Sequence, residues 1–259
     1  MLLIVFLTLS CSDGGGREND FPVREASLNG NTFKYRIFIP KGRDPNAKIP
    51  VMLYLHGSGA RGVDNREQLG GFPEWIHEHP ERFQFAIVFP QCPEKTFWTV
   101  PQIEKALGAL VRTVEEVNGD DKRLYLAGYS MGGFGVWQTA IANPDKFAAL
   151  VAVAGGVEAL GVVSAEDRSL LSEQVKTAEA SGDVYSAYAE VLKNVPAWIV
   201  HGDRDDSVPV EQSRKLFAAL KNAGSKDVNY FELAGADHAI IGRTFQDEKL
   251  FEWLRQKSK

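Results

Sequence analysis

Short apolar runs alternate with segments of helical character along most of the chain. The runs are apolar at most positions, as expected of strands that helices cover on both faces. They occupy residues 51–55, 85–89, 123–127, 147–154, 197–200 and 228–233. The intervening segments predict helices, most clearly where apolar residues recur every three or four positions between Pro101 and Val117. The other expected helices cover residues 66–78, 133–142, 210–223 and 244–255.

Two further strand-like runs, residues 23–28 and 32–39, open this pattern and are joined by Asn29-Gly30-Asn31, a strong hairpin signal. A hairpin followed by repeated strand–helix units predicts an α/β fold. Its sheet is mainly parallel and twisted, with an N-terminal antiparallel hairpin and helices on both faces. Residues 157–194 interrupt the alternation with a mostly helical composition. We therefore expect a small helical insert or lid after the sixth strand of one domain that spans residues 23–259.

The first 22 residues follow a different pattern. Residues 1–11 form an apolar run that is shorter than the about 20 residues needed to span a bilayer, and it is typical of a secretory signal. Cys11 at its end resembles the lipidation site of a bacterial lipoprotein, and residues 12–20 are polar and glycine-rich, like a flexible tether. No Lys or Arg precedes the run, and Thr8 stands where leucine is usual, so cleavage elsewhere is the alternative. We expect a leader and tether over residues 1–22 and export from a bacterial cell, with the protein lipid-anchored at Cys11, periplasmic or secreted.

Composition and charge restrict the class of partner. The chain has 259 residues, of which 44% are hydrophobic and 24% charged, an ordinary globular composition. Its net charge of −5, without a basic block, gives no indication of nucleic acid or of an anionic membrane surface as a partner. Membrane contact is therefore expected only through a lipid anchor at Cys11. Cys11 and Cys92 are the two cysteines, no Cys/His cluster has metal-ligand spacing, and we expect neither metal nor organic cofactor.

The pentapeptide Gly128-Tyr129-Ser130-Met131-Gly132 lies between an expected strand and an expected helix. Strand, Gly-x-Ser-x-Gly and helix together are typical of a nucleophile elbow, a tight turn that exposes one serine hydroxyl. Side chains at Gly128 and Gly132 would collide where the helix returns against the strand. Ser130 is therefore the candidate nucleophile.

Serine needs an adjacent base and a group that orients this base. After an elbow the partners are expected in the order acid, then histidine. His238 follows the last expected strand and the acid candidates, so it is the candidate base. Asp203, Asp205 and Asp206 compete for the role of acid in one loop after residues 197–200, and charge alone does not choose among them. Because the carboxyl ends of parallel strands meet at one edge of a sheet, these loops are expected to form one site.

Four segments together resemble the α/β-hydrolase superfamily, in particular its secreted esterases and predicted peptidases, the phospholipase/carboxylesterase-like and feruloyl-esterase-like proteins. These segments are the glycine-rich loop at 55–65, Phe89-Pro90-Gln91-Cys92-Pro93, the elbow at 128–133 and the acid loop at 195–209. The resemblance covers about residue 23 to the C-terminus and implies an α/β-hydrolase fold. It also implies that Ser130 is the nucleophile, Asp205 the acid and His238 the base.

An oxyanion hole supplies backbone N–H donors to the negative charge that develops during acyl transfer. One donor is expected from Met131, directly after the nucleophile. The resemblance implies that the second is the N–H of Ser58, with Gly59 as an alternative. Trp75, Trp98 and His56 lie near strand ends and are candidate substrate-binding residues, although core packing would explain the tryptophans equally well.

These residues predict a serine hydrolase of carboxylic esters that works through an acyl-enzyme. Its expected substrate is a small or polysaccharide-linked ester, which is inferred by analogy with the family. A serine peptidase of the same fold is the first alternative, and an insert shaped to bind a peptide would favour it. A non-catalytic binding module on a hydrolase scaffold is the second, and the complete set of Ser, Asp and His candidates argues against it.

Overall fold

A single sheet of eight strands runs through the computed structural model, which describes residues 17–259. The strands lie in the order β1-β2-β4-β3-β5-β6-β7-β8, and only β2 is antiparallel to its neighbours. Their bounds are β1 (Val23–Leu28), β2 (Asn31–Phe38), β3 (Ile49–Leu55), β4 (Ala86–Pro90), β5 (Gly119–Tyr129), β6 (Ala149–Val153), β7 (Ala197–Gly202) and β8 (Val228–Leu233). The expected mainly parallel sheet with an N-terminal antiparallel hairpin is confirmed.

Alternate side chains of the central strands enter two separate hydrophobic cores, because successive residues of a strand point to opposite faces. In β3, Val51, Leu53 and Leu55 belong to one core, whereas Met52 and Tyr54 belong to the other. Both sets are buried, which explains why the central strands read as continuous apolar runs rather than as alternating patterns.

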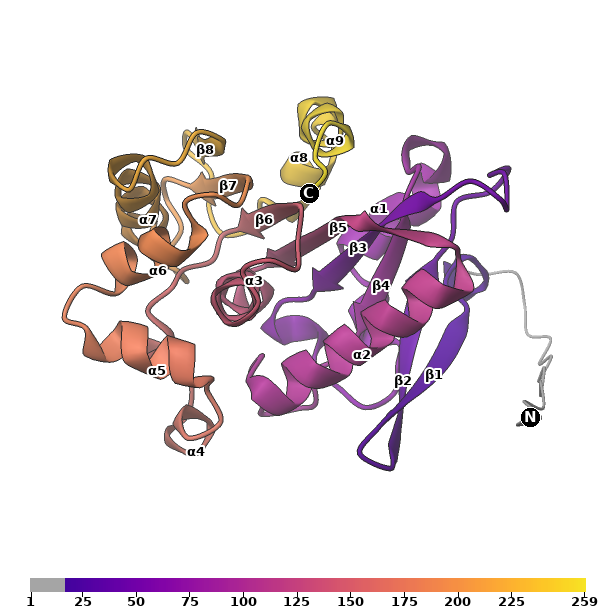
Figure 1. Cartoon of the computed structure of the whole chain (residues 1–259), viewed down its shortest axis with the longest axis horizontal. Coiled ribbons are helices and arrows are strands. Elements are labelled where there is room, and N and C mark those ends of the chain that lie inside the picture. The colour runs from indigo at the N-terminus through magenta and orange to yellow at the C-terminus, as the bar shows by residue number, and fades with distance from the viewer. Residues whose placement is uncertain (1–16) are drawn as a thin grey trace.

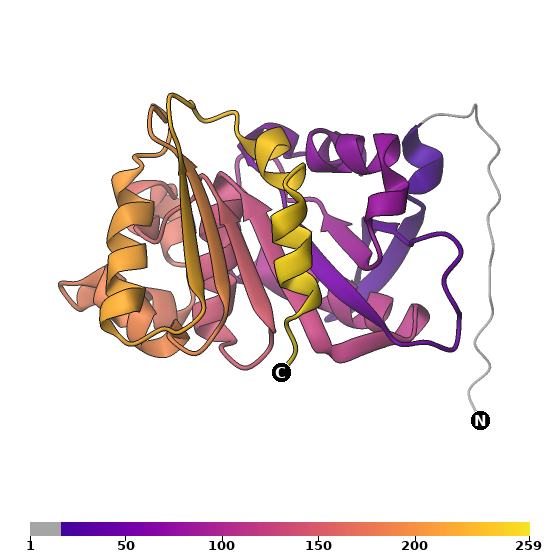
Figure 2. The ribbon, with the colours of Figure 1, turned by 90° about the horizontal axis from the view of Figure 1, so that it is seen from above.

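Helices cover both faces of the sheet (Figure 1). The first core lies under α2 (Val100–Glu116), α3 (Met131–Ala142) and α7 (Glu211–Asn222). The second lies under α1 (Phe72–Glu78), α8 (Ile241–Phe245) and α9 (Glu248–Arg255). Figure 2 shows α9 lying across the sheet, on the face opposite α2 and α3. Four short 3-10 helices complete the first half of the described chain: η1 (Arg17–Asp20), η2 (Ser58–Ala60), η3 (Glu67–Leu69) and η4 (Pro80–Arg82).

Two expected helices are each divided in the structure. The segment 66–78 becomes η3 and α1, because Gly70 and Gly71 separate them and Gly71 adopts a φ of 71° that a helix does not allow. The segment 244–255 becomes α8, which begins earlier at Ile241, and α9. Asp247 leaves the helical conformation between them, and its side chain accepts the N–H of Lys249 as the N-cap of α9. The expectation of one continuous helix was wrong in both places.

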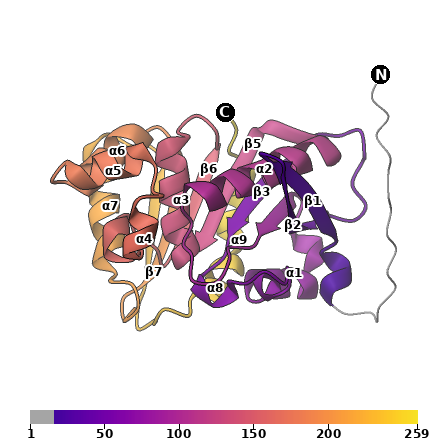
Figure 3. The same cartoon turned by 90° about the horizontal axis from the view of Figure 1, so that it is seen from below.

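Residues 157–194, which connect β6 to β7, form η5 (Ala159–Gly161), α4 (Ala165–Arg168), α5 (Glu173–Ala180) and α6 (Val184–Leu192). Side chains of Ser164, Ser172 and Asp183 cap the three α-helices by accepting backbone N–H groups. Helices α5 and α6 pack beside α3 and α7, at the end of the molecule away from the β1–β2 hairpin (Figure 3).

The expected leader, including Cys11, lies outside the described residues apart from its last few positions. Within residues 17–259, no helix combines the length and the apolar character required to cross a membrane.

Candidate active site

Ser130 occupies the turn between β5 and α3 with a φ of 55° and a ψ of −119°, in a region that non-glycine residues rarely adopt. Such a conformation persists only where the surrounding packing enforces it. A Cβ atom at Gly128 would overlap the carbonyl oxygen of Gly132, and one at Gly132 would overlap the carbonyl oxygen of Leu55. The backbones of α3, β5 and β3 are therefore in direct contact around the serine.

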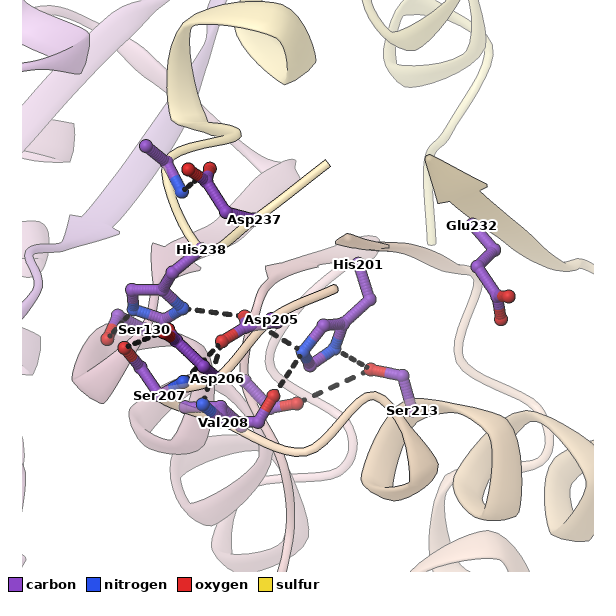
Figure 4. A network of polar contacts seen from close by, with 12 residues as sticks. Ser130, His201, Asp205, Asp206, Ser207, Val208, Ser213, Glu232, Asp237 and His238 are labelled. Atoms are coloured by element: carbon purple, nitrogen blue, oxygen red, sulfur yellow. Dashed lines mark hydrogen bonds and ion pairs between the residues drawn. The ribbon is translucent and has the colours of Figure 1, made fainter. Parts of the chain in front are cut away.

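Three side chains from distant parts of the chain form one line of hydrogen bonds at the carboxyl ends of the strands (Figure 4). Ser130 Oγ lies 2.8 Å from Nε2 of His238, and Nδ1 of His238 lies 2.6 Å from Oδ2 of Asp205. A carboxylate only accepts hydrogen bonds, so His238 carries its proton on Nδ1 and leaves Nε2 free to accept from the serine hydroxyl. His238 is 21% exposed, whereas the side chain of Asp205 has no exposure.

Asp205 alone of the three acid candidates makes a hydrogen bond to His238. Two backbone donors hold its other oxygen: the N–H groups of Ser207 at 2.9 Å and of Val208 at 2.8 Å both reach Oδ1. Asp203 instead accepts the N–H of Gly235 at 2.7 Å and so joins the two loops that carry the acid and the histidine. Asp206 is exposed, and among residues 17–259 its carboxylate accepts only from the hydroxyl of Ser207.

Tyr129 also belongs to the site, although it was not among the residues predicted from the sequence. Its hydroxyl donates to the backbone carbonyl of His238 at 2.9 Å, and the two rings lie 5.2 Å apart. Burial, together with the nearby Asp205 and Asp237 carboxylates, raises the pKa of Tyr129 to about 12, so the hydroxyl remains a donor at neutral pH. Its position inside the Gly-x-Ser-x-Gly pentapeptide, next to the nucleophile, was the signal that could have indicated this role.

The two segments that carry the expected oxyanion donors both adjoin Ser130. Met131 is the first residue of α3, so its N–H belongs to the turn whose donors have no acceptor within the helix. The loop that contains Ser58 rests on the elbow, because a Cβ atom at Gly57 would lie 3.4 Å from the Cβ of Ser130. Arg61, from the end of this loop, donates from Nε to the sulfur of Met131 at 3.2 Å and ties the two donor segments together.

The side chains of His56, Trp98 and Trp75 are all buried, which corrects their assignment as candidate substrate-binding residues. His56 is 3% exposed, accepts the N–H of Cys92 at Nε2 and faces the carbonyl of Gly57 with Nδ1. Trp98 is 1% exposed and donates to the carbonyl of His56. Trp75 is buried in the second core against Phe83 and Phe251. Core packing and internal hydrogen bonds therefore account for all three rings.

The remaining chemistry-bearing groups do not assemble into a second centre in the described part of the chain. Cys92 is a buried free thiol, and burial raises its pKa to about 11, which makes it a poor nucleophile. Residues 17–259 contain no group of three or more His, Cys, Asp and Glu side chains placed to hold a metal ion.

The C-terminal part of the chain decides its family. Residues 98–259, which include the elbow, the acid loop and the histidine loop, match the model of the prolyl oligopeptidase family. The chain belongs to this family. The match begins at Trp98, so the loop that contains Ser58 lies outside it.

Individual relatives extend the family similarity over most of the chain. An uncharacterized secreted protein of Arthroderma benhamiae is 25% identical over 243 residues, which cover 87% of this chain and 25% of that protein. Feruloyl esterase B of Thermothelomyces thermophilus is 28% identical over 207 residues, which cover 72% of this chain and 68% of the relative. The crystal structure of a thermostable esterase superposes with a TM-score of 0.72 and 28% identity, over 93% of this chain and 64% of the other. The fold is therefore that of the α/β hydrolases, and this chain spans a quarter of the Arthroderma protein and about two thirds of the two esterases.

Burial of His56 predicts a specific loss of stability in acid. Desolvation lowers the pKa of His56 from 6.5 to about 4. Between these two pH values the imidazole binds a proton in the unfolded chain but not in the folded chain. The free energy of unfolding therefore has its full value above about pH 6.5 and decreases as the pH falls towards 4. His56→Gln keeps an acceptor for the N–H of Cys92 but does not titrate. We therefore expect its free energy of unfolding to fall by about 1–2 kcal/mol less than that of the wild type when the pH is lowered from 7 to 5.

Urea unfolding at both pH values measures this difference. Any constant destabilisation by the substitution cancels in the comparison. An equal loss of unfolding free energy in both proteins would contradict the buried, neutral state of His56.

Proposed function

We propose that this chain is a serine hydrolase of carboxylic esters, with Ser130 as nucleophile, His238 as general base and Asp205 as the acid that orients it. The observation that carries the proposal is the continuous line from Ser130 Oγ through His238 to Asp205, with contacts of 2.8 and 2.6 Å. Membership of the prolyl oligopeptidase family supports serine chemistry at this site.

In the proposed reaction, Ser130 Oγ attacks the acyl carbon while its proton passes to Nε2 of His238. The Asp205 carboxylate stabilises the imidazolium that forms, and the N–H groups of Met131 and Ser58 donate to the oxyanion. His238 then returns the proton to the leaving alcohol, which produces an acyl-enzyme. Water, deprotonated by His238, attacks the acyl carbon and releases the acid and the free serine.

Two relatives that are named as esterases favour esters over peptides as substrates. Feruloyl esterase B and the thermostable esterase are each 28% identical to this chain. By analogy with the esterases of this fold, acyl groups of carbohydrate or related small esters are the proposed substrates. A peptidase remains the second candidate because the family is named after an oligopeptidase. A non-catalytic binding module is disfavoured, since the serine, histidine and aspartate are in hydrogen-bonding contact.

A panel of model substrates tests the proposal: an acetyl ester, a feruloyl ester, a longer acyl ester and a peptide anilide. We expect kcat/KM for the preferred ester to exceed that for the anilide by about 100-fold or more, a discrimination within reach of a binding pocket. Ser130→Ala should lower ester turnover by about 10⁴-fold or more, because the nucleophile is lost. If Ser130→Ala retains turnover, or if the anilide is the better substrate, the corresponding part of the proposal is wrong.

The assignment of the acid has its own matched set of variants. Asp205→Asn should lower kcat by about 10⁴-fold, because an amide favours the wrong tautomer of His238. Asp203→Asn and Asp206→Asn carry the same chemical change in the same loop and should cost less than about 10-fold, since neither carboxylate contacts the imidazole. Steady-state kinetics on the same ester compares them, and similar losses in all three would overturn the choice of Asp205.

We also propose that the protein is exported, with lipidation at Cys11 or release from the leader at another position. The apolar run that ends at Cys11 supports this, as does the relative named a secreted protein. We expect the mature protein, expressed from the full sequence in a bacterial host, to begin at an acylated Cys11. Mass spectrometry of the N-terminal peptide measures this. An unmodified N-terminus after Cys11 would exclude the anchor but retain export, and an intact Met1 would exclude both.

A further inference from the structure

A second imidazole lies on the far side of Asp205 from His238 (Figure 4). It belongs to His201, on β7, and it has no solvent exposure. Its Nε2 atom lies 3.0 Å from the carbonyl oxygen of Val208 and 3.2 Å from Oδ2 of Asp205. This Oδ2 is the same carboxylate oxygen that receives His238.

The surroundings of His201 determine which nitrogen carries its proton. A backbone carbonyl and a carboxylate only accept hydrogen bonds, so Nε2 faces two acceptors and must be the protonated nitrogen. Nδ1 lies 2.7 Å from the hydroxyl of Ser213 on α7, which is able to donate. Burial lowers the pKa of His201, so the ring is neutral at neutral pH and Nδ1 accepts a hydrogen bond from the Ser213 hydroxyl.

We propose that His201 is a positioning residue for the Asp205 carboxylate. Its Nε2–H, which donates to the carbonyl of Val208, also faces Oδ2 of Asp205 at 3.2 Å, and these two acceptors fix the tautomer of the ring. This inference rests on the proposed function, because it concerns the acid of that triad. Four N–H groups then surround the buried carboxylate: those of Ser207 and Val208 face Oδ1, and those of His238 and His201 face Oδ2. His201 acts only through Asp205.

The arrangement has a consequence for the pH dependence of catalysis. Without the donor from His201, Oδ2 keeps His238 as its one side-chain donor, in a place where the Asp205 side chain has no contact with solvent. More negative charge on Oδ2 is then available to stabilise the imidazolium form of His238. The acidic limb of the pH profile of kcat/KM therefore moves to higher pH. A residue that merely fills space would change stability or overall rate, but would leave the limb where it is.

The other charged and titratable groups around this pair come from each neighbouring element. They are Tyr129 at the end of β5, Asp206 in the acid loop, Asp237 beside His238, Glu232 on β8 and Arg214 on α7. Glu232 and Arg214 pair with each other at 2.6 Å, and all five groups are unchanged in the variants below.

Two substitutions at His201 separate the donor from the shape. In His201→Gln the amide nitrogen can occupy the place of Nε2 and still donate, whereas His201→Leu removes the donor. We expect His201→Leu to lower kcat/KM for the preferred ester by up to about 100-fold, as expected when a catalytic group is slightly misplaced. We also expect it to shift the acidic limb upward by about half a pH unit or more. His201→Gln should restore most of the rate and the wild-type limb.

Leu216→Ala is the matched control for lost stability. Leu216 is buried on α7, the helix that carries Ser213, and it belongs to the first core rather than to the site. This variant should unfold at a lower temperature but keep the wild-type acidic limb. If His201→Leu keeps the wild-type limb and loses no more activity than Leu216→Ala, the positioning role is refuted. Failure of the proposed function is a separate outcome, recognised by activity that persists in Ser130→Ala.

Nuclear magnetic resonance of protein labelled with ¹⁵N-histidine tests the tautomer without any activity measurement, so the inference remains testable if His201→Leu does not fold. We expect a neutral His201 with its proton on Nε2 at pH 7. His56 is an internal reference with the opposite expectation, because its Nδ1 faces the carbonyl of Gly57 and its Nε2 accepts from Cys92. The signals of His201 and His56 are assigned by the signal that disappears in His201→Gln and in His56→Gln, respectively. A proton on Nδ1 of His201 alone would overturn the proposal.

Discussion

Direct backbone-to-backbone contact around Ser130 is the constraint on which the rest of the site depends. Helix α3 begins against the ends of β3, β5 and β6, and no side chain separates these segments at Gly128, Gly132 or Gly155. A Cβ atom at Gly155 would lie 2.6 Å from the backbone of Gly133, so the contact continues on the next strand. Overpacking at a well-packed contact typically costs about 1–3 kcal/mol, which indicates how strongly the turn is enforced. The strained φ of Ser130 is sustained by this packing.

The buried carboxylate of Asp205 imposes the second requirement. An ionised side chain without solvent contact is costly unless donors surround it. Two of its donors are backbone N–H groups only two and three residues further along the same loop, so the acid loop itself stabilises this charge independently of His238. Asp203 and Tyr129 then hold the His238 loop in place, through the N–H of Gly235 and the carbonyl of His238. Charge stabilisation and loop positioning are thus divided between different residues.

Most of the fold could be predicted from the sequence, because fully apolar strands and helix-spaced segments have distinct local patterns. The strand that ends at the elbow and the order of Ser130, the acid loop and His238 follow from such patterns, whereas the choice of Asp205 within the acid loop came from the resemblance to the α/β hydrolases. The division of the 244–255 segment was missed because no Gly or Pro marks the break at Asp247, and only the capping contact reveals it. The tryptophans were ambiguous for a different reason. Proximity to a strand end in sequence does not determine on which face of the sheet a ring is buried, and Trp98 and Trp75 enter opposite cores.

The two His-Gly pairs show where local reasoning ends. His56-Gly57 follows β3 and His201-Gly202 ends β7, and in each pair the glycine allows another segment to approach closely. A Cβ atom at Gly57 would lie 3.1 Å from the ring of Tyr129, and one at Gly202 would overlap the carbonyl oxygens of Ala236 and Asp237. The two histidines nevertheless carry their protons on opposite nitrogens, because Nε2 of His56 accepts the N–H of Cys92 whereas Nε2 of His201 faces two acceptors, Asp205 and Val208. A buried imidazole takes its role from the partners that the tertiary fold brings to it, so identical dipeptides at equivalent strand ends stabilise a loop in one case and contact the acid in the other.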